Sequence, residues 1–328
     1  MRRIEEIKKL LIEFEGISRK FVLPSIIRRL REESFNGNTP HSLGEDSAAI
    51  GTNSDEMILL TTDSIVEELC LNHPHAAGFN VVLANVMDIY AAGGTPTSFA
   101  AALSYSEPNI GEELLNGLIE GSRKFRVPII RGHTNPTASS TYVVGSSTGT
   151  VKRADMLTAG GALEGDSLVL IFCSTGKRGE SYRLGWDCVT ERTSDEVVSR
   201  LSVMNSLAME RVLNASKDVS VAGLIGTAGM LVEYSGKGGV IDLDAVEKTR
   251  PDSIIFDDWI RMFVSMGFLV STPPENLERV FSIVERHHMR AEVIGIVDST
   301  DSLRIRLGDE ELVLFDFSEG PVLTPHGT

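Results

Sequence analysis

The sequence predicts an α/β or α+β protein with two mixed-sheet domains. The chain has 328 residues, which suggests roughly two domains of ordinary size. Short apolar runs alternate with longer segments whose apolar residues recur at helical spacing, as is typical of folds that mix strands and helices. A polar, Gly-rich stretch at residues 151–165 interrupts this alternation. We therefore expect one domain over residues 1–155 and a second over residues 156–328.

The first half is expected to place two helices before a set of strands that surround a long buried helix. The first helix is amphipathic and is predicted to end at Gly16, and the paired Gly93 and Gly94 are predicted to stop the long helix. The segment VPII is predicted to be a short buried strand, and residues 141–151 a β-ribbon that closes this half. In chain order we expect helices over residues 1–16 and 24–31, strands over 47–50 and 57–65, a helix over 75–92, a strand over 97–104, a helix over 111–125, and strands over 127–130 and 141–151.

The second half repeats this alternation without an obvious repeat of residues. The Gly-rich segment YSGKGG lacks the GxxxxGK[ST] pattern of a P-loop, so it is interpreted as a helix end and a turn into the next strand. The aromatic residues Trp186, Trp259 and Phe263 are more typical of core than of a substrate pocket. We expect strands over residues 167–172, 238–243, 267–272, 292–297, 303–307 and 311–317, and helices over 194–213, 221–234 and 275–287.

Composition excludes several classes of partner. The chain has 31 basic and 46 acidic residues, a net charge of -15, which argues against nucleic acid or an anionic membrane as the main partner. An acidic protein that handles an anionic substrate needs metal cations to mediate. The three cysteines form no CxxC pair, no signal-peptide pattern opens the chain, and no run approaches the about 18 apolar residues of a membrane span. We expect a cytoplasmic protein.

Oxygen-bearing side chains stand at the ends of predicted elements in the first half. Asp46 precedes a strand in GEDSAAI, and Asp63 ends one in TTDSI. Asn85 and Asp88 are three residues apart on the long helix, so they share a face. Mg²⁺ prefers hard oxygen ligands, usually one or two carboxylates with water and phosphate oxygens. Each residue alone is more often a cap or a turn residue, so the metal-site hypothesis depends on the whole set.

Five motifs in order resemble one enzyme superfamily. GEDSAAI, TTDSI, NVMDIYAAGGTP, RGHTN and SKDVSVAGLIGTAGM are similar to the motifs of aminoimidazole ribonucleotide (AIR) synthetase, thiamine-monophosphate kinase, selenophosphate synthetase and the hydrogenase-maturation dehydratase. Together they extend from about residue 43 to residue 229. The segments FEGISRK, GWD and KDVSVAGLIGTAGMLVEYS most resemble an AIR synthase-related branch that includes methanogenesis marker protein 2.

The resemblance implies an ATP- and Mg²⁺-dependent enzyme that works as a homodimer. In this superfamily two N-terminal domains form a shared β-barrel, and ATP and magnesium lie in the adjoining groove. Asp46, Asp63 and Asp88 match magnesium positions, and Asn85 matches a position that contacts ATP phosphate. Glu45 replaces the first Asp of the family's Gly-Asp-Asp, which keeps the charge and lengthens the side chain.

Further positions follow from the resemblance, each with a structural alternative. His133 and Thr134 match a Gly-Gly-His-Thr pattern, in which His133 would contact phosphate, although a histidine after a strand also hydrogen-bonds loops. Asp218 would approach the nucleotide or metal and Lys217 would balance phosphate charge, while Ser220 would cap the next helix. Asp218 and Ser220 are equally explained as caps.

Two functions remain open from the sequence, and a scaffold without metal is the least supported. The first is an enzyme that uses ATP and Mg²⁺ to phosphorylate or activate an oxygen of a small molecule. The second is a nucleotide-binding maturation or regulatory factor without turnover. The cysteine chemistry of selenophosphate synthetase and of the hydrogenase-maturation enzyme has no counterpart here. Lys20 would fold over bound ATP, as a flexible segment does in relatives, although an exposed lysine is usually only solvated.

Overall fold

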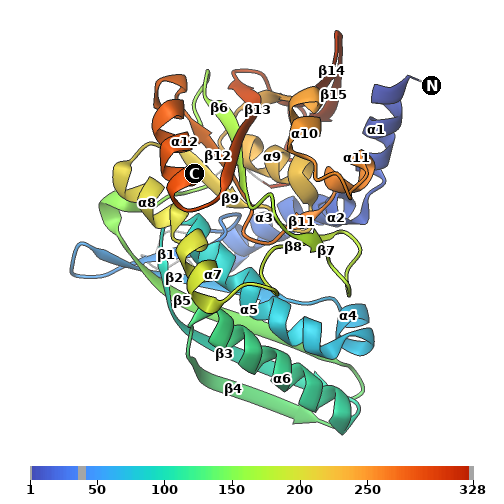
Figure 1. Cartoon of the computed structure of the whole chain (residues 1–328), viewed down its shortest axis with the longest axis vertical. Helices are drawn as coiled ribbons and strands as arrows, with labels where there is room; N and C mark the ends of the chain where they lie inside the picture. The colour runs from blue at the N-terminus through green and yellow to red at the C-terminus, as the bar shows by residue number, and fades with distance from the viewer. Residues whose placement is uncertain (1, 36–41, 325–328) are drawn as a thin grey trace.

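The described residues form two main sheets, each with its own helices, that meet along one side, and a small third sheet (Figure 1). The structure is a computed structural model that describes residues 2–35 and 42–324. The mixed α/β class and the two sheet-bearing units agree with the prediction. The N-terminal helices are α1 (Arg3–Ile12), α2 (Glu15–Ser18) and α3 (Leu23–Glu33), with a 3₁₀ turn η1 (Arg19–Val22) before α3.

The first sheet is an open, five-stranded sheet with the order β1-β2-β5-β3-β4. Helices α5 and α6 lie side by side across one of its faces (Figure 1). The predicted β-ribbon is instead the central strand β5, which pairs with both β2 and β3. The elements are β1 (Ala48–Gly51), β2 (Glu56–Ser64), α4 (Glu67–Asn72), α5 (Pro74–Ala91), β3 (Thr95–Tyr105), α6 (Pro108–Phe125), β4 (Ile129–Pro136) and β5 (Tyr142–Lys152).

The prediction of a buried strand at VPII is wrong. Strand β4 begins at Ile129, is exposed along its whole length, and pairs only with β3 among the residues that the structure describes. Ile130 is 68% exposed, and Ile58 and Leu60 on the helix-free face of β2 are 39% and 40% exposed. An apolar run predicts burial, but it does not say whether the chain itself or another molecule supplies the cover. Among the described residues of one chain no closed barrel forms.

The second sheet has seven strands in the order β15-β14-β10-β13-β6-β12-β9, so β15 and β9 are its edge strands. The helix predicted over residues 194–213 is two helices that break at Ser202, and the one predicted from residue 221 begins at Gly223. The strands are β6 (Ser167–Phe172), β9 (Ala215–Asp218), β10 (Gly238–Asp242), β12 (Phe268–Thr272), β13 (Arg290–Asp298), β14 (Ser302–Leu307) and β15 (Glu310–Asp316), with a small sheet of β7 (Lys177–Arg178), β8 (Gly185–Asp187) and β11 (Phe263–Val264).

The helices of the second unit enclose a core that continues into the first unit. Helix α9 is buried along its whole length, and Trp186 and Trp259 are core residues, as expected. Among the described residues, no helix has both the length and the apolar character needed to span a membrane. The helices are α7 (Ser194–Leu201), α8 (Val203–Glu210), α9 (Gly223–Tyr234), α10 (Leu243–Thr249), α11 (Phe256–Trp259) and α12 (Leu277–Arg286), with 3₁₀ turns η2 (Arg153–Asp155) and η3 (Pro274–Asn276).

The two ends of the described chain pack on the second unit. Helix α1 lies against β14 and β15, where Arg2 forms an ion pair with Glu310 at 3.1 Å. Gly16 does not end α1 but lies within α2, where a Cβ atom would come 2.1 Å from the carbonyl oxygen of Val221. Near the other end, the carboxylate of Glu233 accepts hydrogen bonds from three consecutive backbone N–H groups, those of Val322, Leu323 and Thr324.

Close contact between α5 and α6 depends on two glycines. A Cβ on Gly117 would come 2.0 Å from the carbonyl oxygen of His75, and one on Gly78 would come 2.1 Å from that of Leu114. Backbone oxygens cannot rotate away, so any side chain here forces the helices apart. Helix α6 thereby holds α5 against the first sheet.

We expect Gly117→Ala to lower the free energy of unfolding by about 1–3 kcal/mol, because the overpacking cost exceeds the roughly 1 kcal/mol that alanine gains in helix propensity. Unfolding in urea measures it. Gly51→Ala is the control, since its Cβ would meet its nearest atom at 3.7 Å. A Gly117→Ala protein as stable as the control would contradict the close-packing account.

Candidate functional site

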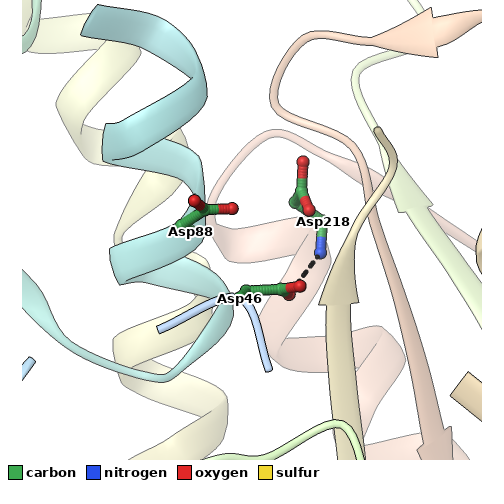
Figure 2. Close-up of side chains that lie close together, drawn as sticks. All are labelled: Asp46, Asp88 and Asp218. Carbon is green, nitrogen blue, oxygen red and sulfur yellow. Dashed lines mark hydrogen bonds between the residues drawn. The ribbon is translucent and has the colours of Figure 1, made fainter. Parts of the chain in front are cut away.

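Three carboxylates from distant parts of the sequence converge where the two units meet. They belong to Asp46 in the loop before β1, Asp88 on α5 and Asp218 at the end of β9 (Figure 2). One oxygen from each lies within 4.8 Å of the other two. We call these three residues the acidic cluster. The first unit supplies two of its members and the second unit supplies the third.

The loop that carries Asp46 is fixed from both sides. Gly44 adopts φ +107°, and a side chain there would collide with the ring of Tyr234 on α9. Glu45 turns toward the second unit, where its carboxylate accepts a hydrogen bond of 2.7 Å from the N–H of Ala159. Ser47 donates from its hydroxyl to the carbonyl oxygen of Asp88 at 3.1 Å. The two acids of GEDSAAI therefore differ in role, since Glu45 joins the units and Asp46 enters the cluster.

Strand β2 presents a second pair of polar side chains to α5. Thr61 donates a hydrogen bond to the carboxylate of Asp88, and the carboxyl of Asp63 lies close enough to Asp88 to help raise its pKa. Thr61 and Asp63 are two residues apart, so they share the face of the strand that α5 covers. Asp63 therefore adjoins the acidic cluster through Asp88.

Strand β9 contributes a cation as well as an acid. Lys217 forms an ion pair with Oδ1 of Asp46, and its side chain is only 4% exposed. The backbone N–H of Asp218 donates to Oδ2 of the same carboxylate at 3.2 Å. Both oxygens of Asp46 are thus held by β9. Among the described residues, Lys217 is the one cation with an ion pair to the cluster.

Burial and crowding of like charges shift the acidity of the site. Burial, reinforced by the charge of Asp46, raises the pKa of Asp218 to about 8. Burial and the neighbouring acids raise the pKa of Asp88 well above its usual range. Burial also raises the pKa of Glu45 to about 7. Burial alone would lower the pKa of Lys217, but the charges of Asp46 and Asp218 outweigh it and raise the pKa. The electrostatic free energy of the site is therefore lowered when these carboxylates bind protons or another cation.

Three buried oxygens near the cluster have no hydrogen-bond partner among the described residues. The amide of Asn85 donates to the carbonyl oxygen of Val81 at 2.8 Å, which leaves its Oδ1 unpaired. The hydroxyls of Ser216 and Ser220 are also unpaired, so the prediction that Ser220 caps α9 is wrong, and Ala222 stands at the cap position. Ser216 lines a cavity of about 10 Å³ together with Glu45 and Asp46. Unpaired polar atoms beside carboxylates are ready to bind water or a ligand.

Lys20 lies in the turn η1, close enough to the cluster to interact electrostatically with Asp218 and Asp63. Burial, together with the charges of Arg19 and Lys217, lowers the pKa of its ammonium. Its side chain is partly buried rather than freely solvated.

His133 and Thr134 are not brought to the cluster within one chain. Their neighbour Gly132 lies in the same cross-strand row as Asp63, three strands away, which corresponds to about 14 Å. The ring of His133 contacts the side-chain oxygen of Asn135 at 3.2 Å. Both residues line an exposed groove of about 330 Å³ between β4 and α6, together with apolar residues such as Ile130.

Sequence reasoning missed Thr61 and the link made by Glu45. Thr61 could have been found, because it stands two residues before Asp63 on a strand and must share its face. Glu45 could not, because its partner Ala159 is 114 residues away and offers only a backbone N–H.

Comparison with known proteins gives the family. The family model for the AIR synthase related protein N-terminal domain matches residues 44–151, and that for the C-terminal domain matches residues 157–308. The chain belongs to the AIR synthase related protein family. The resemblance inferred from the five motifs is therefore confirmed.

Relatives share the family across most of their length. An uncharacterised protein of Methanocaldococcus jannaschii is 32% identical over 308 residues, covering 93% of this chain and 94% of its own. The thiamine-monophosphate kinase of Pyrococcus abyssi is 26% identical over 285 residues, covering 82% of this chain and 86% of its own.

Two solved structures share the fold. T. maritima PurL complexed with ATP superposes with a TM-score of 0.76 at 17% identity; the match covers 96% of this chain but about half, 52%, of that one. AaThiL complexed with AMPPCP and TMP superposes with a TM-score of 0.63 at 18% identity, covering 96% and 99%.

We expect the metal-free protein to lose stability as the pH rises from 6 to 9. An acid whose pKa is higher in the folded than in the unfolded state stabilises the fold below its unfolded pKa, and this contribution is lost as the pH passes the folded value of about 8 for Asp218. Urea unfolding in EDTA measures the slope. Asp218→Asn should flatten it, whereas the exposed control Asp309→Asn should not. Equal slopes in all three proteins would contradict the assignment.

Proposed function

We propose that this protein is an ATP- and Mg²⁺-dependent enzyme that phosphorylates or activates an oxygen of a small molecule. The convergence of Asp46, Asp88 and Asp218 from three separated segments carries the proposal. Kinship with thiamine-monophosphate kinase and the fold shared with PurL complexed with ATP support it.

The side chains present fit a magnesium ion. The cluster offers hard carboxylate oxygens from rigid elements, with Asp63 beside it, and these are the ligands that Mg²⁺ prefers. Asp46, Asp63, Asp88 and Asp218 would hold the ion or ions. When bound, Mg²⁺ would neutralise the charge of the ATP phosphates and of the carboxylates around it.

The chain's own residues would act mainly by positioning. In-line transfer of a phosphoryl group depends on alignment and charge neutralisation more than on a protein nucleophile. Lys20, in the turn beside Asp218, would contact the phosphate tail of ATP. The unpaired Oδ1 of Asn85 would accept a hydrogen bond from water at the site. Burial of Asp88 and Asp218 excludes bulk water and strengthens each of these interactions.

We expect Asp46→Ala and Asp63→Ala each to weaken binding of a non-hydrolysable ATP analogue by at least about tenfold, because each removes a carboxylate from the group that attracts and positions the cation. Isothermal titration with and without Mg²⁺ measures the loss, with circular dichroism to verify folding. Asp55→Ala, at an exposed acid in the turn before β2, is the matched control. Unchanged Mg²⁺-dependent binding in both site variants would sink the proposed metal site.

Product analysis separates turnover from binding alone. ADP that appears only when a candidate small molecule is added supports the enzyme, whereas tight ATP binding without ADP across a broad metabolite panel favours a regulatory or maturation factor. The same panel identifies the acceptor if one is present.

The assembly we propose is a homodimer in which the open first sheets of two copies form a shared β-barrel. Among the described residues strand β4 has an unpaired edge, where Ile130 is exposed, and the helix-free face of β2 exposes Ile58 and Leu60. A second copy would cover this face and would also bring the partner's His133 and the partner's Thr134 toward the acidic cluster. The groove between β4 and α6 would then lie at an interface.

We expect the wild-type protein to have twice the 35.7 kDa chain mass by light scattering after gel filtration. Leu60→Asp and Ile130→Asp should shift it to the single-chain mass, because a charge buried against an apolar face is strongly unfavourable. Leu163→Asp, at a leucine that is 56% exposed away from this sheet, should leave the mass unchanged. A wild-type protein of single-chain mass at micromolar concentration would rule out the dimer.

A further inference from the structure

Lys217 occupies an unusual position for a lysine. It lies on the edge strand β9, its side chain is 4% exposed, and its ammonium contacts an aspartate that belongs to the other sheet-bearing unit. Lysines are almost never fully buried unless they are paired, because removing an ammonium from water is costly. The placement of Lys217 is therefore tied to the negative charge around it.

Both carboxylate oxygens of Asp46 are bound by groups of strand β9. Oδ1 of Asp46 contacts Lys217, and Oδ2 accepts the N–H of Asp218 at 3.2 Å. An ammonium is a compact point charge with three donors, so it satisfies carboxylate oxygens much as a small metal ion does. The oxygens of Asp88 and Asp218 lie within 4.8 Å of Asp46 but have no ion pair among the described residues. One side of the cluster is thus neutralised by the chain and the other is not.

We infer that Lys217 is a resident cation of the acidic cluster, holding the place at Asp46 that an additional divalent ion would otherwise take. This inference rests on the proposed function, because it assumes that the cluster binds divalent cations. It sets the number of ions, since the wild-type chain takes one fewer than its carboxylates alone would accept. It also explains how the two units stay joined when no metal is present.

The competing explanation is an ion pair that only joins the units. The two explanations differ in whether a metal can replace the lysine. A purely structural pair, once broken, leaves a deficit that Mg²⁺ does not repair. A resident cation, once removed, leaves a vacant place that a divalent ion fills.

Lys217→Met in the full chain tests the inference by Mn²⁺ binding without nucleotide, counted by electron paramagnetic resonance and titration calorimetry. We expect one more Mn²⁺ per chain than in the wild type, bound at least about tenfold more tightly than any wild-type ion, because one nearby positive charge is gone. In EDTA the variant should melt at a lower temperature, and Mn²⁺ or Mg²⁺ should restore the wild-type midpoint.

Two controls separate the outcomes. Lys217→Arg keeps the charge and should keep the wild-type ion count. Arg178→Met breaks the ion pair of 2.9 Å to the buried Asp258, away from the cluster, and should lower the melting temperature without recovery in Mn²⁺.

The inference is overturned if Lys217→Met binds the same number of ions at the same affinity as the wild type and its midpoint does not recover. If neither protein binds divalent ions, the proposed function fails as well, so the two failures are distinguishable. If the variant does not fold in EDTA, folding during a Mg²⁺ titration gives the answer: recovery supports the inference, and failure at every concentration overturns it.

Discussion

Mutual repulsion among buried carboxylates is the constraint around which this molecule is organised. Asp46, Asp88 and Asp218 are within 4.8 Å of one another at the contact of two units, with Asp63 beside them and Lys217 as the paired cation. Such crowding opposes folding. The surrounding structure must therefore hold the groups together. A bound cation would relieve this repulsion, so the repulsion adds to the free energy of cation binding.

The scaffold supplies that force through contacts that leave little freedom. Helix α5, which carries Asp88, is held by α6 through glycines that admit no side chain. The loop of Asp46 is fixed by Glu45, whose carboxylate reaches Ala159 in the second unit, and by Gly44 against Tyr234. Both anchors of the loop involve the second unit. A change in the distance between the units is consequently a change in the geometry of the site.

The sequence predicted which acidic residues come together better than it predicted what surrounds them. Apolar periodicity and Gly pairs located most helices and strands, and the spacing of Asn85 and Asp88 placed both on one face of the helix that is α5. Motif order singled out Asp46, Asp63, Asp88 and Asp218, whose proximity then appears in the structure. The exposure of Ile130 was not predictable from the sequence. An apolar side chain tends to be covered, but the sequence does not say whether its own chain or another molecule covers it. The contact of Glu45 with the second unit was not predictable either. Its partner is a backbone N–H, and every residue other than proline has one.

The members of the acidic cluster are synthesised at different times, because they lie far apart in the sequence. Asp46 and Asp218 are 172 residues apart, and Asp88 is also made long before β9. At typical synthesis rates the early carboxylates wait on the order of ten seconds for Lys217 to emerge. During that interval the carboxylate of Asp46 in the nascent chain lacks its ion pair with Lys217. The acidic cluster is therefore complete only after strand β9 has been made.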